Sequence, residues 1–475
     1  MMAAGRPPNV LILMSDEHSP HATGYEGNAV VRTPALDRLA ARGVWFRNAY
    51  CQSPLCVPSR MAHLASRHLH RINVWSNGDA LDSAVPTIPA YFREHGYFCV
   101  STGKMHFVGP DQMHGFELRP YGDHTHPIRD SGRGPDPYDP KRVRGAGPRD
   151  ECAHCRRDER VTEIGLDLLR GWHAGQYGSG RERRPLLLWI SWLRPHFPFW
   201  PPVRHWQMYD PATVDLPPRD DLADKPVRLA RWRRHWGLEN LTEEELRRAR
   251  AAYYALVSFV DEQVAAVLDT LQQLGLEEDT LVIYCTDHGE MAGEHGMWYK
   301  SVFFEAAART PLIFSWPGRL PQGRMVSQTV ELNDMFPTIA AACGLPLPQD
   351  VDGANLWPLL IGERDDWRDE ALSEFATQGS PSPAVMLRTG RWKYVHYGWP
   401  DAPAPEDEEL YDLAADPHEL RNLARDPATG DFRRELRARI RQRWHLPEPW
   451  RQALAERLAR ARGTGFSYEG PNRAG

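Results

Sequence analysis

The chain has 475 residues, of which 41% are hydrophobic and 25% are charged, and its formal net charge at pH 7 is −6. This length suits a large domain with a smaller one, and the composition is typical of a soluble globular protein. The weakly negative charge excludes a polyanion-binding surface, so we expect no nucleic-acid partner. Lysine is scarce, with five residues among 57 basic ones, which makes each lysine a candidate for a special role.

The N-terminal sequence carries no signal for export. Residues 1–8 contain no apolar segment of the kind found in signal peptides, and the first apolar run, residues 10–14, has the length of a strand. No stretch of the chain approaches the roughly 20 apolar residues that span a bilayer. We therefore expect a cytoplasmic protein without a membrane partner.

The first predicted strand leads to two acidic residues. Residues 9–14 are continuously apolar, which indicates a buried parallel strand, and Asp16 and Glu17 follow it closely. Ligands of open α/β sheets bind beyond the carboxyl ends of the strands, and neighbouring buried carboxylates are unfavourable unless a cation accepts them. We predict that both residues bind a hard divalent cation such as Ca²⁺ or Mg²⁺, with a solvated turn as the alternative.

A special cysteine is predicted at position 56. A predicted strand at residues 44–50 leads to the sequence Ser-Pro-Leu-Cys-Val-Pro-Ser-Arg at residues 53–60. A helix beginning near Pro58 would place Arg60 one turn beyond Cys56, because proline suits the first turn of a helix. Helix N-termini bind anions, so an anionic ester would dock beside this cysteine. A buried structural cysteine is the alternative.

The next predicted strand, residues 97–101, leads to Gly-Lys-Met-His-Phe at residues 103–107. In an extended chain Lys104 and His106 point to the same side, because side chains alternate along it. A cation beside an acid–base group suits a site for a charged ester. An ordinary surface pair is the alternative.

A long irregular segment and another candidate histidine follow. Residues 118–159 are rich in Gly, Pro, Asp and Arg and predict a loop, and the Cys-Ala-His-Cys sequence near its end is interpreted as part of that loop. Residues 161–173 predict a helix and residues 185–191 a buried strand. The Arg-Pro-His-Phe-Pro sequence after this strand holds His196 between two prolines. His196 is therefore a candidate acid or base, with a plain loop histidine as the alternative.

Another strand end offers metal ligands. A capping box begins a predicted core helix over residues 242–274, and residues 280–286 form the next buried strand. Asp287 and His288 follow this strand in the same way that Asp16 and Glu17 follow the strand at residues 9–14. We therefore predict that they complete the same metal site. The imidazole of His288 shifts the preferred ion from Ca²⁺ towards Mn²⁺.

The elements predict an α/β fold in which residues 1–365 form a large, mixed but mostly parallel sheet flanked by helices. The pattern then changes, because residues 385–397 predict a hairpin and residues 433–462 an Arg- and Glu-rich helical region. We predict that residues 366–475 form a small α+β subdomain with an antiparallel sheet. Its charged helical region is a solvated face or a homo-oligomer contact.

These motifs together resemble the sulfatase family, within the alkaline-phosphatase-like superfamily. The shared features are Cys-x-Pro-Ser-Arg at residues 56–60, Lys-x-His at 104–106, Pro-His-x-Pro at 195–198, Asp-His at 287–288, and Lys300. They follow the family's order, and the resemblance covers about residues 9–425. The run at residues 103–117 looks most like the choline-sulfatase branch.

The resemblance implies that the protein hydrolyses a sulfate monoester. In the family, a formylglycine-generating enzyme oxidises the cysteine to formylglycine, whose hydrated aldehyde is the nucleophile. Carried to this sequence, Cys56 is the modified residue, and Arg60 belongs to the modification signal and later holds the nucleophile.

The other motif residues take their roles from the same resemblance. Lys104, Lys300 and the cation neutralise the sulfuryl oxygens. His196 protonates the leaving oxygen, and His106 acts as the base when sulfate departs. Glu17 stands where the family has a second Asp, which leaves its direct ligation of the metal open.

Two other activities remain open at this point. Related enzymes hydrolyse phosphonate monoesters or phosphodiesters at the same kind of site, since both anions are tetrahedral and similarly charged. The other alternative is a binding protein in which Cys56 stays unmodified. The full set of acid, base and cation residues argues against it.

A choline-like substrate would need an aromatic cage for its quaternary ammonium group. The aromatic residues next to the motifs are Trp75, Phe199, Trp200 and Trp298. Core packing of these rings is the alternative.

Overall fold

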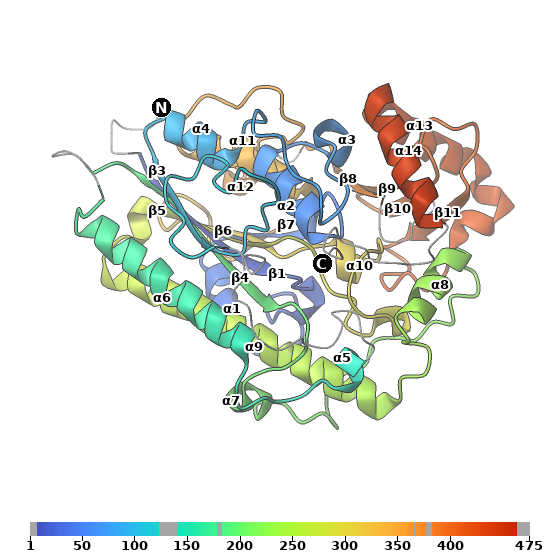
Figure 1. Ribbon diagram of the computed structural model, residues 1–475, viewed down its shortest axis with the longest axis horizontal. Helices are drawn as coiled ribbons and strands as arrows, with labels where there is room; N and C mark the ends of the chain where they lie inside the picture. Colours follow the sequence, from blue (N-terminus) through green and yellow to red (C-terminus); the bar gives the residue numbers. More distant parts are fainter. Residues whose placement is uncertain (1–6, 123–140, 178–182, 365, 377–381, 463–475) are drawn as a thin grey trace.

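A computed structural model of the protein describes residues 7–122, 141–177, 183–364, 366–376 and 382–462 (Figure 1). Within these residues, seven strands form one sheet in the order β3-β4-β1-β5-β6-β2-β7. The strands are β1 (Asn9–Asp16), β2 (Val44–Tyr50), β3 (Phe98–Gly103), β4 (Leu186–Pro195), β5 (Thr280–Thr286), β6 (Leu312–Ser315) and β7 (Arg324–Glu331). β6 is antiparallel to both neighbours and the other pairs are parallel, which confirms the predicted mixed sheet.

Helices cover both faces of this sheet (Figure 1). α6 (Ala153–His173) and α9 (Glu243–Gln273) lie side by side on one face, where both contact β4. α2 (Cys56–Ala65), α4 (Ile88–Glu94) and α11 (Met335–Ala342) lie on the other face. Further helices are α1 (Pro34–Ala41), α3 (Leu69–Ile72), α5 (Lys141–Arg144), α7 (Val203–Trp206), α8 (Val227–His235), α10 (Glu305–Ala308) and α12 (Trp357–Ile361).

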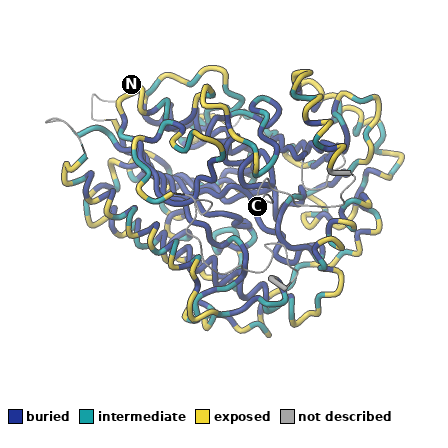
Figure 2. The backbone as a smooth tube through the Cα atoms, viewed as in Figure 1, coloured by how far each residue is buried: buried dark blue, intermediate teal, exposed yellow. Residues whose placement is uncertain are grey.

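The central strand β1 shows why its sequence is continuously apolar. Val10, Ile12 and Met14 belong to the core beneath α2, whereas Leu11 and Leu13 belong to the core beneath α9. A strand buried on both faces has no polar side to present. Figure 2 shows the same distribution, with the central strands buried and the exposed residues on the outer surfaces of the helices.

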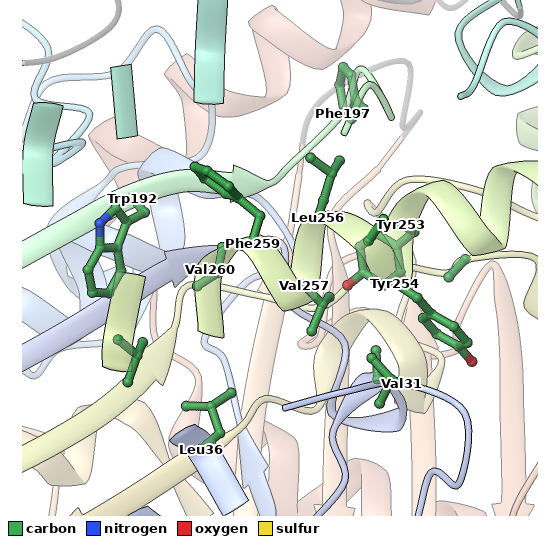
Figure 3. Close-up of a cluster of buried hydrophobic side chains, with 14 of the residues drawn as sticks. Val31, Leu36, Trp192, Phe197, Tyr253, Tyr254, Leu256, Val257, Phe259 and Val260 are labelled. Atoms are coloured by element: carbon green, nitrogen blue, oxygen red, sulfur yellow. The ribbon is translucent and has the colours of Figure 1, made fainter. Parts of the chain in front are cut away.

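The long helix α9 supplies much of one core. The predicted capping box is present, with Thr242 and Glu245 bonded to each other's backbone N–H groups. Figure 3 shows Leu256 and Val260 of α9 in the cluster that also holds Trp192 of β4. By length and composition α9 is able to cross a membrane, but 78% of its most apolar window is buried inside the protein. This packing accounts for its apolar residues.

The loop predicted over residues 118–159 ends earlier than expected. α6 begins at Ala153, so the last part of the predicted loop is helical, and residues 123–140 lie outside the described part of the chain. Cys152 and Cys155 form a disulfide at the start of α6. The Cys152 sulfur also accepts a hydrogen bond from the backbone N–H of Cys155, so it caps the helix.

The second sheet is antiparallel, with the order β11-β10-β9-β8, as the sequence predicts. Its strands are β8 (Glu370–Phe375), β9 (Ala384–Thr389), β10 (Trp392–Tyr397) and β11 (Asp407–Asp412). β9 and β10 form the expected hairpin, while β8 was not predicted. The helical region divides into α13 (Gly430–Arg443) and α14 (Glu448–Arg462). The predicted boundary at residue 365 remains a prediction, since that residue lies outside the described part.

A buried lysine ties the second sheet to the segment around α10. Lys393 of β10 is 0% exposed, and its Nζ lies 2.7 Å from Glu305 Oε1 and 2.7 Å from Glu419 Oε1. The same ammonium group donates a hydrogen bond to the Phe303 carbonyl, three residues after Lys300. The small sheet therefore fixes the segment that carries one of the predicted catalytic residues.

We predict that Lys393→Met destabilises the protein by about 3 kcal/mol, because removing one partner leaves buried carboxylates without their cation. Urea unfolding of the purified variant measures the change. Arg364→Met is the matched control, because the Arg364–Asp366 pair is exposed and such pairs contribute about 0–1 kcal/mol. Equal unfolding midpoints for Lys393→Met and the control would show that this tie is unimportant.

Candidate active site

Cys56 is the first residue of α2, with Leu55 as the N-cap in an extended conformation. The helix thus begins two residues earlier than the predicted start near Pro58. Asn77 accepts a hydrogen bond from the Val57 backbone N–H at 3.0 Å, which satisfies one of the free N–H groups of the first turn. The cysteine side chain lies at the positive end of this helix.

The Cys56 thiol is enclosed. The residue is 1% exposed, and its Sγ lies 3.2 Å from Nε2 of His288. Burial raises the pKa of this thiol to about 12, although Lys104 and Lys300 favour the thiolate. An unmodified Cys56 is therefore a neutral thiol near pH 7, and the neutral form is a weak nucleophile.

Arg60, one turn after Cys56, joins the strand ends around the site. Its Nε donates to Asp287 Oδ2 at 2.8 Å, and one Nη donates to Asp16 Oδ2 at 2.7 Å. The other Nη donates to the Lys104 carbonyl at 2.5 Å and to Ser191 Oγ at 3.1 Å. Asp16, Lys104 and Asp287 stand at the ends of β1, β3 and β5, and Ser191 lies within β4, so one guanidinium group joins four strands.

The predicted metal ligands form a buried cluster. Asp16, Cys56, Asp287 and His288 each offer a ligand atom, and these atoms all lie within 4.8 Å of one another. A second group, within the same limit, contains Asp16, Glu17 and His196. Despite burial, Lys104 and Arg60 hold the pKa of Asp16 well below its usual range, so the carboxylate is ionised.

The cluster fits a divalent cation on its own chemistry. Among the described residues, Asp16 Oδ1 and Glu17 Oε1 are buried without a hydrogen-bond partner. A buried oxygen in this state is unfavourable, and an ion at that position would satisfy it. Asp16, Asp287 and His288 would supply two carboxylates and an imidazole.

Glu17 belongs to the second group, with Asp16 and His196, and not to the group around Cys56. Its Oε2 accepts a hydrogen bond from Lys300 Nζ at 2.5 Å and lies 3.2 Å from His196 Nε2. Burial raises the pKa of Glu17 well above its usual range, against the effect of Lys300. Glu17 thus contacts the cationic side of the site, and its direct ligation of a metal stays a prediction.

Two cations and a histidine complete the site. Lys104 Nζ forms an ion pair with Asp16, and Lys300 Nζ lies 2.9 Å from His196 Nε2. His196 Nδ1 donates to the Phe197 carbonyl at 2.7 Å, which leaves Nε2 facing the site. Burial, together with Lys300, lowers the pKa of His196 well below its usual range. An incoming anion would oppose this effect and favour the protonated ring.

His106 follows β3 and is 8% exposed. Its φ is 61°, so the backbone is not extended there, and the reasoning that placed His106 and Lys104 on one side by alternation is wrong. The role of His106 as a base stays a prediction.

The rings considered for an aromatic cage pack in the core. Trp75, Phe199 and Trp298 are 1%, 0% and 0% exposed, and the last two have ring centroids 5.0 Å apart. The half-buried Trp200 has the Arg149 guanidinium 5.0 Å from its ring centroid. The structure therefore favours the packing alternative, and the cage hypothesis is not supported for these residues.

The sequence reasoning missed several side chains that hold the site. Ser59 Oγ donates to the Asp287 carbonyl at 2.5 Å, and Ser191 Oγ donates to the Lys104 carbonyl at 2.5 Å. Glu290 is fully buried and accepts hydrogen bonds from backbone N–H groups of the segment before Lys300. Glu290 is close to the Asp287-His288 pair in the chain, which was an available signal. The serines carried none.

Comparison with known proteins identifies related sequences. The family profile described as Sulfatase matches residues 8–345, and that of the N-sulphoglucosamine sulphohydrolase C-terminal region matches residues 293–445. A choline-sulfatase of Rhizobium meliloti (strain 1021) is 35% identical over 446 residues, which cover 90% of this chain and 84% of the relative. Arylsulfatase K of Homo sapiens is 29% identical, covering 89% and 80%.

A solved structure shares the fold. The phosphonate monoester hydrolase of Agrobacterium radiobacter superposes with a TM-score of 0.75 at 25% identity, covering 95% of this chain and 96% of that one. Together with the matched profile, these similarities show that the chain belongs to the sulfatase family. It is a sulfuric ester hydrolase.

We predict that Asp16→Asn and Asp287→Asn each remove bound divalent metal together with activity. Loss of an outer-shell partner alone costs about 10–100-fold, so we expect activity to fall by about 100-fold or more when a ligand is lost. Elemental analysis of the purified variants measures the metal, with the exposed Asp350→Asn as control. Unchanged metal content in both variants would place the ion elsewhere.

Proposed function

We propose that the protein hydrolyses a sulfate monoester with a formylglycine nucleophile made from Cys56 and with one divalent metal ion. The observation that carries this proposal is the position of Cys56 at the start of α2, inside the cluster formed by Asp16, Asp287 and His288. The thiol itself is a poor nucleophile at this buried position, so a modified residue accounts better for the surrounding acid, base and cation groups.

The metal ion would be Ca²⁺ or Mn²⁺, with Mg²⁺ as a further candidate, held by Asp16, Asp287 and His288. When bound, such an ion lowers the pKa of a coordinated hydroxyl group and neutralises negative charge. His288 favours Mn²⁺ over Ca²⁺ because imidazole is a poor ligand for hard cations. Arg60 holds both carboxylates in place through its two hydrogen bonds to them.

The remaining residues act on the substrate. Lys104 and Lys300 bind the oxygens of the sulfate group, which they reach by exchanging their present carboxylate partners for the substrate. His196 delivers a proton from Nε2 to the leaving oxygen as the ester S–O bond breaks. His106 is proposed as the base of the second step, in which sulfate leaves. The net reaction consumes one water and gives an alcohol and sulfate.

The partners follow from this chemistry. We propose a small sulfate ester as substrate and a formylglycine-generating enzyme as the maturation partner that reads Cys56 and Arg60. The cytoplasmic location, the absence of nucleic-acid and membrane partners, and a homo-oligomer contact remain predictions of the sequence.

We predict that Cys56 is formylglycine in active protein produced together with a maturation enzyme. Mass spectrometry of the peptide that contains position 56 decides this. Cys56→Ala should abolish turnover while its circular dichroism spectrum remains that of the parent. Fully active protein with an unmodified thiol at position 56 would contradict the mechanism.

The second candidate is hydrolysis of a phosphonate monoester or phosphodiester. The solved phosphonate monoester hydrolase favours it, because that enzyme shares the fold over 95% of this chain. Charge alone cannot separate the substrates, since sulfate and phosphonate monoesters both carry one negative charge near pH 7.

We predict faster turnover of sulfate than of phosphorus esters with the same leaving group. The assay compares choline sulfate, an aryl sulfate, a phosphonate monoester and a phosphodiester, and choline sulfate is included because of the similarity to the Rhizobium enzyme. Equal or better turnover of the phosphorus esters would favour the second candidate.

A further inference from the structure

The loop that carries His196 is held from behind by a buried arginine. Arg194, at the end of β4, is 0% exposed and lies two residues before the histidine. One of its Nη groups donates to the His196 carbonyl at 2.5 Å and to the Pro198 carbonyl at 2.9 Å. The guanidinium group therefore turns back onto its own loop and bonds the backbone on both sides of Phe197.

Arg194 is itself fixed from a second element. Asp158 of α6 accepts hydrogen bonds from the backbone N–H groups of Leu193 at 2.9 Å and Arg194 at 2.8 Å. The other Nη of Arg194 donates to the sulfur of Cys152, which is bonded to Cys155 at the start of α6. Helix α6 thus anchors the strand end and the guanidinium group together.

This arrangement determines where the imidazole points. The Nδ1 of His196 contacts the Phe197 carbonyl, and Nε2 contacts Lys300 and Glu17 and lies 3.9 Å from Asp16 Oδ1. The first depends on the backbone of the same loop, so a shift of that backbone moves Nε2. Proton transfer requires an approach of about 2.6–3.2 Å between the heavy atoms, so a displacement of about 1 Å is sufficient to interrupt it.

We propose that Arg194 is a positioning residue that holds His196 Nε2 at the leaving oxygen. The proposal rests on the proposed function, in which His196 protonates that oxygen. The described hydrogen bonds of Arg194 go to its own loop and to α6, so its effect is expected where protonation of the leaving group limits the rate.

The test compares two sulfate esters that differ in the leaving group, a nitrophenyl sulfate and an unsubstituted phenyl sulfate. Nitrophenolate leaves without help, whereas the more basic phenolate needs the proton from His196. For Arg194→Met we expect kcat for phenyl sulfate to fall by about 100-fold, and kcat for nitrophenyl sulfate by no more than about threefold. Bound metal and formylglycine content should equal those of the parent protein.

Three further variants sharpen the comparison. Arg194→Lys keeps a donor and should recover part of the phenyl sulfate rate. Arg149→Met removes an arginine that packs on Trp200 of the same segment, and it should show no dependence on the leaving group. In a His196→Ala background, adding Arg194→Met should change the phenyl sulfate rate by less than about threefold, because residues that act as one unit are not additive.

An equal fall in kcat for both esters in Arg194→Met would overturn the proposal, and so would additive losses in the double variant. If Arg194→Met does not fold, Arg194→Lys carries the same comparison. Failure of the proposed function looks different, because the parent protein would then hydrolyse neither sulfate ester. In that case, the same comparison of Arg194→Met with the parent protein is made with phosphorus esters of nitrophenol and phenol.

Discussion

The structure of the site depends on one buried guanidinium group. Arg60 bonds to Asp16 and Asp287, two carboxylates on neighbouring strands that would otherwise repel each other away from water. All three side chains are at most 1% exposed, so the charges are stable only while they remain together. Arginine suits this task better than lysine, because its planar fork presents several donors at fixed angles. The helix that supplies Arg60 also supplies Cys56, so pairing the charges also places Cys56.

Lysine has a different use in this chain. Each of the four lysines whose side chains the structure describes is buried: Lys104, Lys225, Lys300 and Lys393 are between 0% and 7% exposed. Each forms an ion pair with a carboxylate. Arginine supplies the cations of the exposed surface pairs, for example on α6. Scarcity in the sequence was therefore a useful signal, although it does not separate the two lysines of the site from the two that join segments.

Much of the fold followed from the sequence because the central strands β1, β4 and β5 are buried on both faces and carry largely apolar runs. The ends of β1 and β5 located the acidic ligands for the same reason, since parallel neighbours end at one edge of the sheet. β8 was missed because its apolar residues are interrupted by Ser373 and Glu374, both of which are buried, and Glu374 accepts a hydrogen bond from the Leu69 backbone N–H. The pattern of hydrophobic residues in a sequence does not predict such contacts.

The finer geometry of the site could not be predicted in this way. Glu17 has a φ of 65° and its side chain contacts Lys300, but its position after Asp16 in the sequence indicates neither feature. His106 also has a positive φ, which no residue in its motif indicates. Both residues have a positive backbone φ, which residues other than glycine rarely adopt. Tertiary contacts hold them in this conformation.

The burial of Cys56 has a consequence for the order of modification and folding. Cys56 is 1% exposed, and the Nε and both Nη groups of Arg60 donate hydrogen bonds within the protein. In the folded protein these two side chains are therefore not accessible to another enzyme. Under the proposed function, oxidation of the cysteine must come before this segment closes. The fraction of active molecules then depends on the rate of Cys56 oxidation relative to the rate at which this segment folds. A chain that folds before oxidation stays inactive unless the segment unfolds again.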